Sequence, residues 1–127
     1  MAEDLRSLVD RLKAVSHPLR LRVLALVGAG ELCVCQVAET LSVPASSVSE
    51  ALRELRRAGF VTERKEGRWV FVSCPEPAPP LLEILLREAS SLPEANLDRA
   101  RVAAVKGIPV QDVCRKQLAG MDEATHV

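Results

Sequence analysis

Apolar residues recur along the first part of this chain at the spacing of an α-helix that is buried on one side. Residues 3–15 carry them at i, i+3, i+7 and i+10, which predicts an amphipathic helix. The residues on this face are Leu5, Leu8, Leu12 and Val15. A second helix is predicted next, with Ser16 as its cap and His17 and Pro18 in its opening turn. Its apolar positions are Leu21, Leu24 and Val27.

Two shorter helical segments follow and are joined by a three-residue turn. The first covers about residues 34–41, the second about residues 45–58, and residues 42–44 form the turn. Their inward-facing residues are Val37, Ala38 and Leu41 in the first helix, and Val48, Leu52 and Leu55 in the second. This arrangement has the spacing of a helix-turn-helix.

Strand-like alternation appears directly after these helices. Residues 60–65 and 68–73 are predicted to pair as a hairpin, with Glu66 and Gly67 as a two-residue type I′ turn. A proline-rich stretch at 75–80 ends the alternation. The hairpin lies where a winged helix-turn-helix protein has its wing.

Three further helices are predicted, at about 80–91, 93–106 and 109–119, and the end of the chain from residue 121 is expected to be frayed. The fold class is therefore mainly α with a small β-hairpin wing. We expect a winged helix-turn-helix domain for DNA binding and dimerisation over 1–91. The helical extension over 92–127 is expected to pack on that domain or on a partner protomer.

Composition narrows the class of protein. A chain of 127 residues suits one core, and with 2% aromatic residues that core must rest on aliphatic side chains. No apolar run approaches the roughly 20 residues that span a bilayer. The charged beginning of the chain lacks the apolar block of a signal peptide, so we expect a cytoplasmic protein without a membrane partner. Its 4 cysteines should then be reduced, and are better candidates for ligands or sensors than for structural disulfides.

The net charge of zero does not by itself indicate DNA binding. The helix over 45–58, however, has a polar face opposite its apolar residues. Short hydroxyls there allow close approach to DNA, and arginines can reach bases or phosphates. The candidate DNA-binding residues are Ser46, Ser47, Ser49, Glu50, Arg53 and Arg57 on this helix, and Lys65 and Arg68 on the hairpin.

Cys33 and Cys35 lie where the helix over 34–41 begins. A helix N-terminus lowers the pKa of a thiol, and thiolates prefer soft ions. Zinc-finger spacing is absent because the sequence has no C-x-x-C and only two histidines, His17 and His126. A thiol oxidoreductase would need C-x-x-C in an α/β pattern, and no glycine-rich phosphate loop is present, so an enzyme is not expected.

Four stretches together carry a resemblance to a known family: HPLRLRVLALV (17–27), ELCVC (31–35), ALRELRRAGFV (51–61) and KEGRWVFV (65–72). Over about residues 3–91 the chain resembles the ArsR/SmtB winged-helix metalloregulators, and ELCVC resembles their arsenic- and antimony-responsive branch. The resemblance implies a homodimer formed by the first and fifth helices. It also implies a repressor whose fourth helix enters the major groove of an inverted-repeat operator.

The inducer implied by this resemblance is arsenic(III) or antimony(III), held by Cys33 and Cys35, with no organic cofactor. Where that branch often has an acidic residue and a third cysteine, this chain has Gln36 and Val37. A third thiolate must therefore come from elsewhere. We favour Cys114 of the C-terminal extension, with Cys74 at the end of the hairpin as the alternative.

Other functions remain open at this point. The same thiols could sense cadmium or lead. A redox switch could join Cys33 or Cys35 to Cys74 or Cys114. A DNA-binding or interaction module without any ligand would tolerate serine at every cysteine. The recognition helix also departs from the family, because Ala51 stands where many members have histidine.

Overall fold

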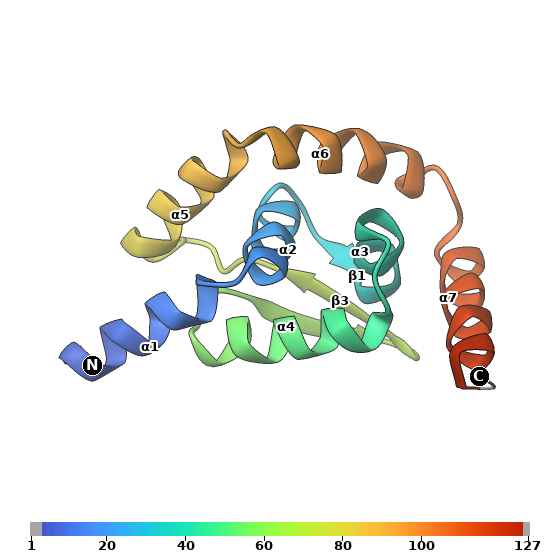
Figure 1. Cartoon of the computed structure of the whole chain (residues 1–127), viewed down its shortest axis with the longest axis horizontal. Coiled ribbons are helices and arrows are strands. Elements are labelled where there is room, and N and C mark those ends of the chain that lie inside the picture. The colour runs from blue at the N-terminus through green and yellow to red at the C-terminus, as the bar shows by residue number, and fades with distance from the viewer. Residues whose placement is uncertain (1–3, 126–127) are drawn as a thin grey trace.

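The structure is a computed structural model that describes residues 4–125, with side chains as far as residue 117. Its helices are α1 (Leu5–Val15), α2 (Pro18–Gly28), α3 (Val34–Leu41), α4 (Ala45–Arg57), α5 (Pro80–Ser90), α6 (Pro93–Lys106) and α7 (Val110–Thr125). The strands are β1 (Leu32–Cys33), β2 (Thr62–Glu66) and β3 (Trp69–Ser73). This order is the predicted winged helix-turn-helix, mainly helical with a small sheet (Figure 1).

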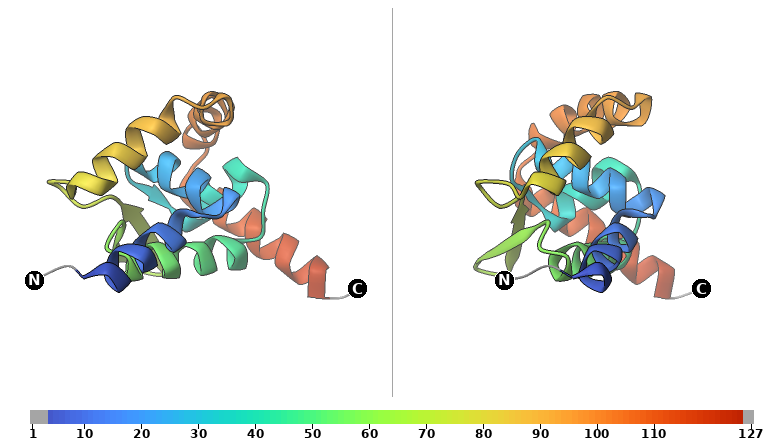
Figure 2. Two further views of the ribbon diagram at one scale, coloured as in Figure 1. Left: turned by 60° about the vertical axis from the view of Figure 1, so that its left-hand side comes forward. Right: turned by 90° about the vertical axis from the view of Figure 1, so that its left-hand side faces the viewer.

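Helix α2 lies at the centre of the fold. Helix α4 and the hairpin lie on one side of it and α6 crosses the opposite side (Figures 1 and 2). The core between these elements is aliphatic apart from Phe60. Its fully buried members include Val23, Leu24, Val27, Val48, Leu52, Leu55, Phe60, Val72 and Leu82. The predicted inward faces of α2, α3 and α4 are thus confirmed where they supply this core.

The cap of α2 differs from the prediction by one residue. His17, rather than Ser16, is the N-cap, and its Nδ1 accepts a hydrogen bond from the backbone N–H of Leu19 at 3.2 Å. Pro18 occupies the first helical position, so the residue directly before it becomes the cap. The hydroxyl of Ser16 instead donates to the carbonyl oxygen of Leu12 at 2.8 Å, within the end of α1.

The helix-turn-helix depends on Ser42, which ends α3 in the left-handed region with φ 56° and ψ 45°. Its backbone N–H bonds to the last carbonyl oxygens of α3, as in other left-handed helix ends. Pro44 then begins α4 as its N-cap. The turn sets α4 across α3, with Val48 and Leu52 in the core and the polar face outward.

The three strands form an antiparallel sheet in the order β1-β3-β2. Glu66 pairs with Trp69, so Gly67 and Arg68 form the turn, one residue later than predicted. Gly67 has φ +62°, whereas Arg68 is not among the positive-φ residues of the described chain. A positive φ at the first turn position alone is the pattern of a type II′ turn, which corrects the predicted type I′.

The helix over 93–106 ends as predicted, but α7 is longer than predicted and continues to Thr125. Residues 121–125 are therefore helical rather than frayed, while 126–127 lie outside the described residues. No proline interrupts the sequence after Pro109, so the helix has no strong stop signal there. Both α6 and α7 pack against α3 of the same chain.

A buried ion pair fixes α6 to α2. Asp98 is 3% exposed and its two carboxylate oxygens accept hydrogen bonds from Arg22 at 3.1 and 2.8 Å. The hydrogen bonds that Arg22 donates to Asp98 raise the pKa of Arg22, so the guanidinium stays charged. This pair positions the start of the C-terminal extension over the domain.

Replacing Asp98 with alanine is expected to lower the free energy of unfolding by about 1–3 kcal/mol, measured by urea denaturation. The loss stays below that of a fully buried pair because the side chain of Arg22 is 36% exposed and can regain water. Asp112→Ala is the control, since its pair with Arg115 is exposed and 3.7 Å long. Equal losses in the two variants would contradict a structural role for the buried pair.

Candidate thiolate site and nucleic-acid interface

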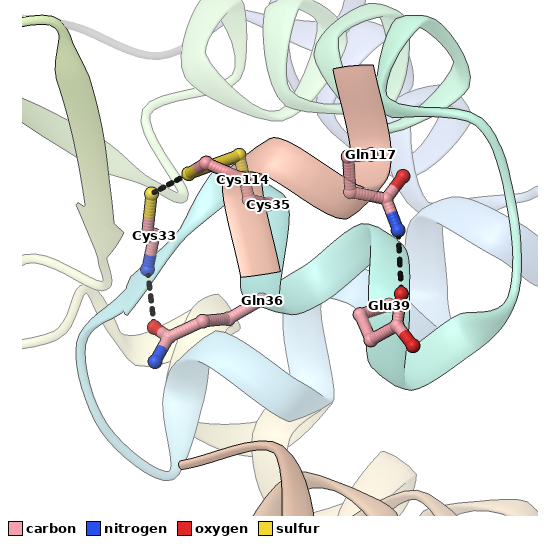
Figure 3. The surroundings of a disulfide bond; sticks show 6 residues. All are labelled: Cys33, Cys35, Gln36, Glu39, Cys114 and Gln117. Carbon is pink, nitrogen blue, oxygen red and sulfur yellow. Dashed lines mark hydrogen bonds between the residues drawn. A yellow bond between two sulfur atoms is a disulfide. The ribbon is translucent and has the colours of Figure 1, made fainter. Parts of the chain in front are cut away.

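Three cysteines from two distant parts of the chain meet beside α3. Cys33 ends β1 and is the N-cap of α3, Cys35 lies in the first turn of α3, and Cys114 lies near the start of α7. Cys33 and Cys114 are buried and Cys35 is half-buried. The change from strand to helix between Cys33 and Cys35 allows both side chains to face α7 (Figure 3).

The three Sγ atoms all lie within 4.8 Å of one another. Those of Cys33 and Cys114 are 4.0 Å apart, and those of Cys35 and Cys114 form a disulfide of 2.50 Å with a Cα–Cα distance of 5.2 Å. Thiolates bound tetrahedrally to one ion at a sulfur distance of about 2.3 Å would lie about 3.8 Å apart. Small side-chain movements therefore separate a disulfide from a three-thiolate site.

Gln36 holds the backbone of Cys33. Its side-chain Oε1 accepts a hydrogen bond from the backbone N–H of Cys33 at 2.8 Å, and Gln36 is 7% exposed. An amide at this position forms the reciprocal half of a capping box at the start of α3. The sequence showed Gln36 only as a departure from the family pattern, and the capping geometry explains its presence.

Glu39 attaches α7 to α3 by polar contacts. Its two carboxylate oxygens accept hydrogen bonds from Nζ of Lys116 at 2.6 Å and from Nε2 of Gln117 at 2.7 Å. The hydrogen bond from Lys116 is the main reason that the pKa of Glu39 is lowered, with a smaller contribution from Gln117. Sequence reasoning missed these contacts, because nothing local indicates a pairing across 77 residues.

Cys74, the alternative third ligand, is not brought into this cluster. Cys33 pairs with Phe71 in the sheet, so Cys74 lies three residues further along, about 10 Å away at the rise of a strand. Burial raises the pKa of the Cys74 thiol to about 11. It therefore stays protonated near neutral pH and is a poor ligand.

The predicted DNA-binding residues of α4 lie along its outer face. Ser46, Ser49, Glu50, Arg53 and Arg57 are exposed, whereas Ser47 is half-buried. On the hairpin, Lys65 and Arg68 are exposed near the turn. Figure 2 shows α4 and the hairpin on the side of the molecule away from α6.

Ala51 is 3% exposed and faces the core. The position at which the family often has histidine therefore lies inside this protein and does not reach DNA.

Two other arginines near this face are held by the protein itself. Arg64 donates to both carboxylate oxygens of Glu31 at 2.7 and 3.1 Å, and its guanidinium lies 4.7 Å from the ring centre of Phe71. Arg56 pairs with Glu63 at 2.5 Å and so joins α4 to β2. These contacts fix the hairpin relative to the residue before β1 and to α4.

Comparison with known proteins identifies the family. A family profile described as "Bacterial regulatory protein, arsR family" matches residues 17–63. The chain is 31% identical over 111 residues to the arsenic resistance transcriptional regulator ArsR2 of Pseudomonas putida, spanning 83% of this chain and 95% of that protein. The chain belongs to the ArsR family.

Two further relatives of this ArsR-family protein show how widely the likeness extends. It is 37% identical over 62 residues to a cadmium resistance regulatory protein CadC homologue of Staphylococcus aureus, covering 48% of this chain and 51% of that one. The structure of HlyU from Vibrio cholerae superposes with a TM-score of 0.59 at 31% identity, over 69% of this chain and 97% of that chain.

Proteins of this family and fold are transcriptional regulators rather than enzymes, and this ArsR-family chain is a DNA-binding transcriptional repressor. In the described part of the chain, no helix combines the length and apolar character that crossing a membrane requires.

Proposed function

We propose that this ArsR-family repressor binds operator DNA as a homodimer in the cytoplasm and releases it when arsenic(III) or antimony(III) binds Cys33, Cys35 and Cys114. The observation that supports this proposal is the meeting of three sulfur atoms within 4.8 Å, two from the start of α3 and one from α7. The reducing cytosol keeps such thiols available for an inducer.

The donor set favours a trivalent metalloid over other ions. The cluster found among the described residues consists of three cysteines, without histidine or carboxylate. Three soft thiolates suit the pyramidal coordination of arsenic(III) or antimony(III). Cadmium, named in the Staphylococcus aureus relative, accepts four thiolates. The remaining cysteine, Cys74, follows β3, lies outside the cluster and has a raised pKa.

Free-thiol counting tests the ligand set directly. In the folded, reduced chain, we expect arsenite to protect three of the 4 cysteines from a thiol-specific reagent and to leave the reaction of Cys74 unchanged. Protection of two cysteines, or of none, would contradict the proposed site.

A redox switch is a second candidate, because the structure contains a disulfide between Cys35 and Cys114. With hydrogen peroxide as oxidant, the two thiols give up two protons and two electrons, the S–S bond forms, and the peroxide is reduced to two waters. Oxidation would then join α7 to α3 at the same place as an ion. Release of DNA by peroxide, reversed by a dithiol and unaffected by arsenite, would favour this candidate.

The cluster is positioned to influence DNA binding because it lies on the first helix of the helix-turn-helix. Helix α3 packs directly on α4, and Cys33 pairs with Phe71 on β3 of the wing. A ligand that binds better to one arrangement of these elements shifts the population toward it. By linkage, DNA must then weaken inducer binding by the same factor.

The proposed homodimer would use exposed apolar residues of α1 and α5. Leu5 is 79% exposed and Ile84 is 55% exposed, and Leu8, Val9 and Leu12 add to the same set. Aliphatic side chains this exposed are expected to be covered by a partner. Two copies of α4 would then face successive major grooves of an inverted-repeat operator.

Arg53→Ala is expected to lower operator affinity by about 10- to 100-fold, since an arginine that contacts a base contributes about 1–3 kcal/mol. Arg53 is exposed at the middle of the outer face of α4. Arg99→Ala, on α6 and away from this face, serves as the control. Fluorescence anisotropy over a range of salt concentrations would measure the operator affinity of both variants. Equal affinities would contradict an α4 that faces DNA.

A further inference from the structure

Helix α7 contacts α3 through two sets of side chains, and only the first set contains sulfur. In the first set, Cys35 faces Cys114. In the second set, Glu39, four residues after Cys35, binds Gln117 (Figure 3). It also binds Lys116. Side chains four apart on a helix lie on the same face. The two attachments therefore share one face of α3, and on α7 Gln117, three residues after Cys114, shares the face of Cys114.

The polar attachment itself contains neither sulfur nor a ligand. Glu39 is its fixed member, because its side chain is 20% exposed, whereas that of Lys116 is 72% exposed. Both oxygens of the carboxylate are occupied, at 2.6 and 2.7 Å. Val113, 2% exposed, adds apolar packing at the start of α7.

Among the side chains that the structure describes, as far as residue 117, no other polar contact between α7 and the rest of the fold lies as close to Cys114. The partly buried pair of Arg22 and Asp98 holds α6. The remainder of α6 and the connection to α7 separate that pair from Cys114. Without the contacts of Glu39, only the apolar packing of α7 on α3 around Val113 would hold Cys114 in place, and α7 would move more. Bringing its thiol back to the other two would cost conformational entropy.

We propose that Glu39 is a positioning residue for the thiolate site, which holds Cys114 beside Cys33 and Cys35 before any ligand binds. Glu39 does not touch the ligand. The identity of the ligand rests on the proposed function, whereas the placement of Cys114 does not.

Placement can be measured without arsenite through the Cys35–Cys114 disulfide. In the full-length protein, the dithiol reacts with oxidised glutathione to give the protein disulfide and two reduced glutathiones. The equilibrium constant reports the effective concentration of one thiol near the other. Glu39→Ala and Lys116→Ala are expected to lower it by about three- to tenfold, a range that allows for the exposure of Lys116.

Two comparisons separate placement from general damage to the helix. Arg115→Ala is the matched control, because Arg115 neighbours Lys116 and pairs with Asp112 on its own helix. It is expected to leave the equilibrium unchanged. The double variant Glu39→Lys with Lys116→Glu is expected to regain most of the lost disulfide equilibrium constant. The operator affinity of all these variants, reduced and without ligand, should match that of the unaltered protein.

Arsenite affinity should fall by the same factor as the disulfide equilibrium in Glu39→Ala. An unchanged disulfide equilibrium in that variant, or an equal fall in Arg115→Ala, would overturn the positioning role. If the unaltered protein bound no arsenite while Glu39→Ala still lowered the disulfide equilibrium, the proposed function would fail and the positioning role would stand.

Discussion

Cys114→Ser is expected to abolish the release of operator DNA by arsenite while leaving the affinity of the ligand-free protein for DNA unchanged. Serine preserves the size of the side chain but replaces a soft thiolate with a hard, protonated hydroxyl. Loss of one arm of a three-thiolate chelate should weaken arsenite binding by roughly 10²- to 10⁴-fold. Because Cys114 lies on α7 and not on α4 or the hairpin, which carry the proposed DNA contacts, DNA binding is expected to be retained.

Cys74→Ser is the matched control for this prediction, since it removes a thiol that lies outside the cluster. Both variants would be titrated with arsenite while bound to fluorescent operator DNA. A normal response in Cys114→Ser together with a lost response in Cys74→Ser would reverse the assignment of the third ligand.

The second large effect is expected in mixed dimers. All three sulfur atoms of the cluster come from one chain. A dimer that combines a Cys35→Ser protomer with a Cys114→Ser protomer should therefore contain no intact site and should not respond to arsenite. If each site were shared between protomers, the same mixed dimer would keep one intact site and about half of the arsenite-binding capacity.

Purified mixed dimers with two different affinity tags would be compared with each parent homodimer for bound arsenic per dimer. The parents should bind arsenite equally weakly, which provides the baseline. Tight binding of one arsenic in the mixed dimer alone would contradict a site within one protomer and would assign Cys114 to the partner's cluster.

Much of the fold could be predicted because it is determined locally. The apolar spacing of Val48, Leu52 and Leu55 placed the buried face of α4. Pro93 and Pro109 marked where α6 and α7 start. The hairpin was predicted, but its turn was placed one residue too early. Gly67 can occupy either central position of a tight turn, and only the pairing of Glu66 with Trp69 decides between them.

The candidate site was predictable only in part. Cys33 and Cys35 could be identified from their position before a helix, because the chemistry of a helix N-terminus is local. Cys114 was favoured over Cys74 without a geometric reason. The contacts of Glu39 with α7 and of Asp98 with Arg22 connect residues far apart in the sequence, and no spacing rule links them. Such long-range pairs required the three-dimensional arrangement of α6 and α7.

Titration of arsenite into the reduced protein bound to DNA from upstream of its own gene tests the central claim most directly. Fluorescence anisotropy would follow release for the unaltered protein and for Cys33→Ser, Cys35→Ser and Cys114→Ser. We expect release from the unaltered protein and none from these three variants at the same arsenite concentration. Release from all four proteins alike, or from none while DNA binding persists, would contradict a repressor controlled by this thiolate cluster.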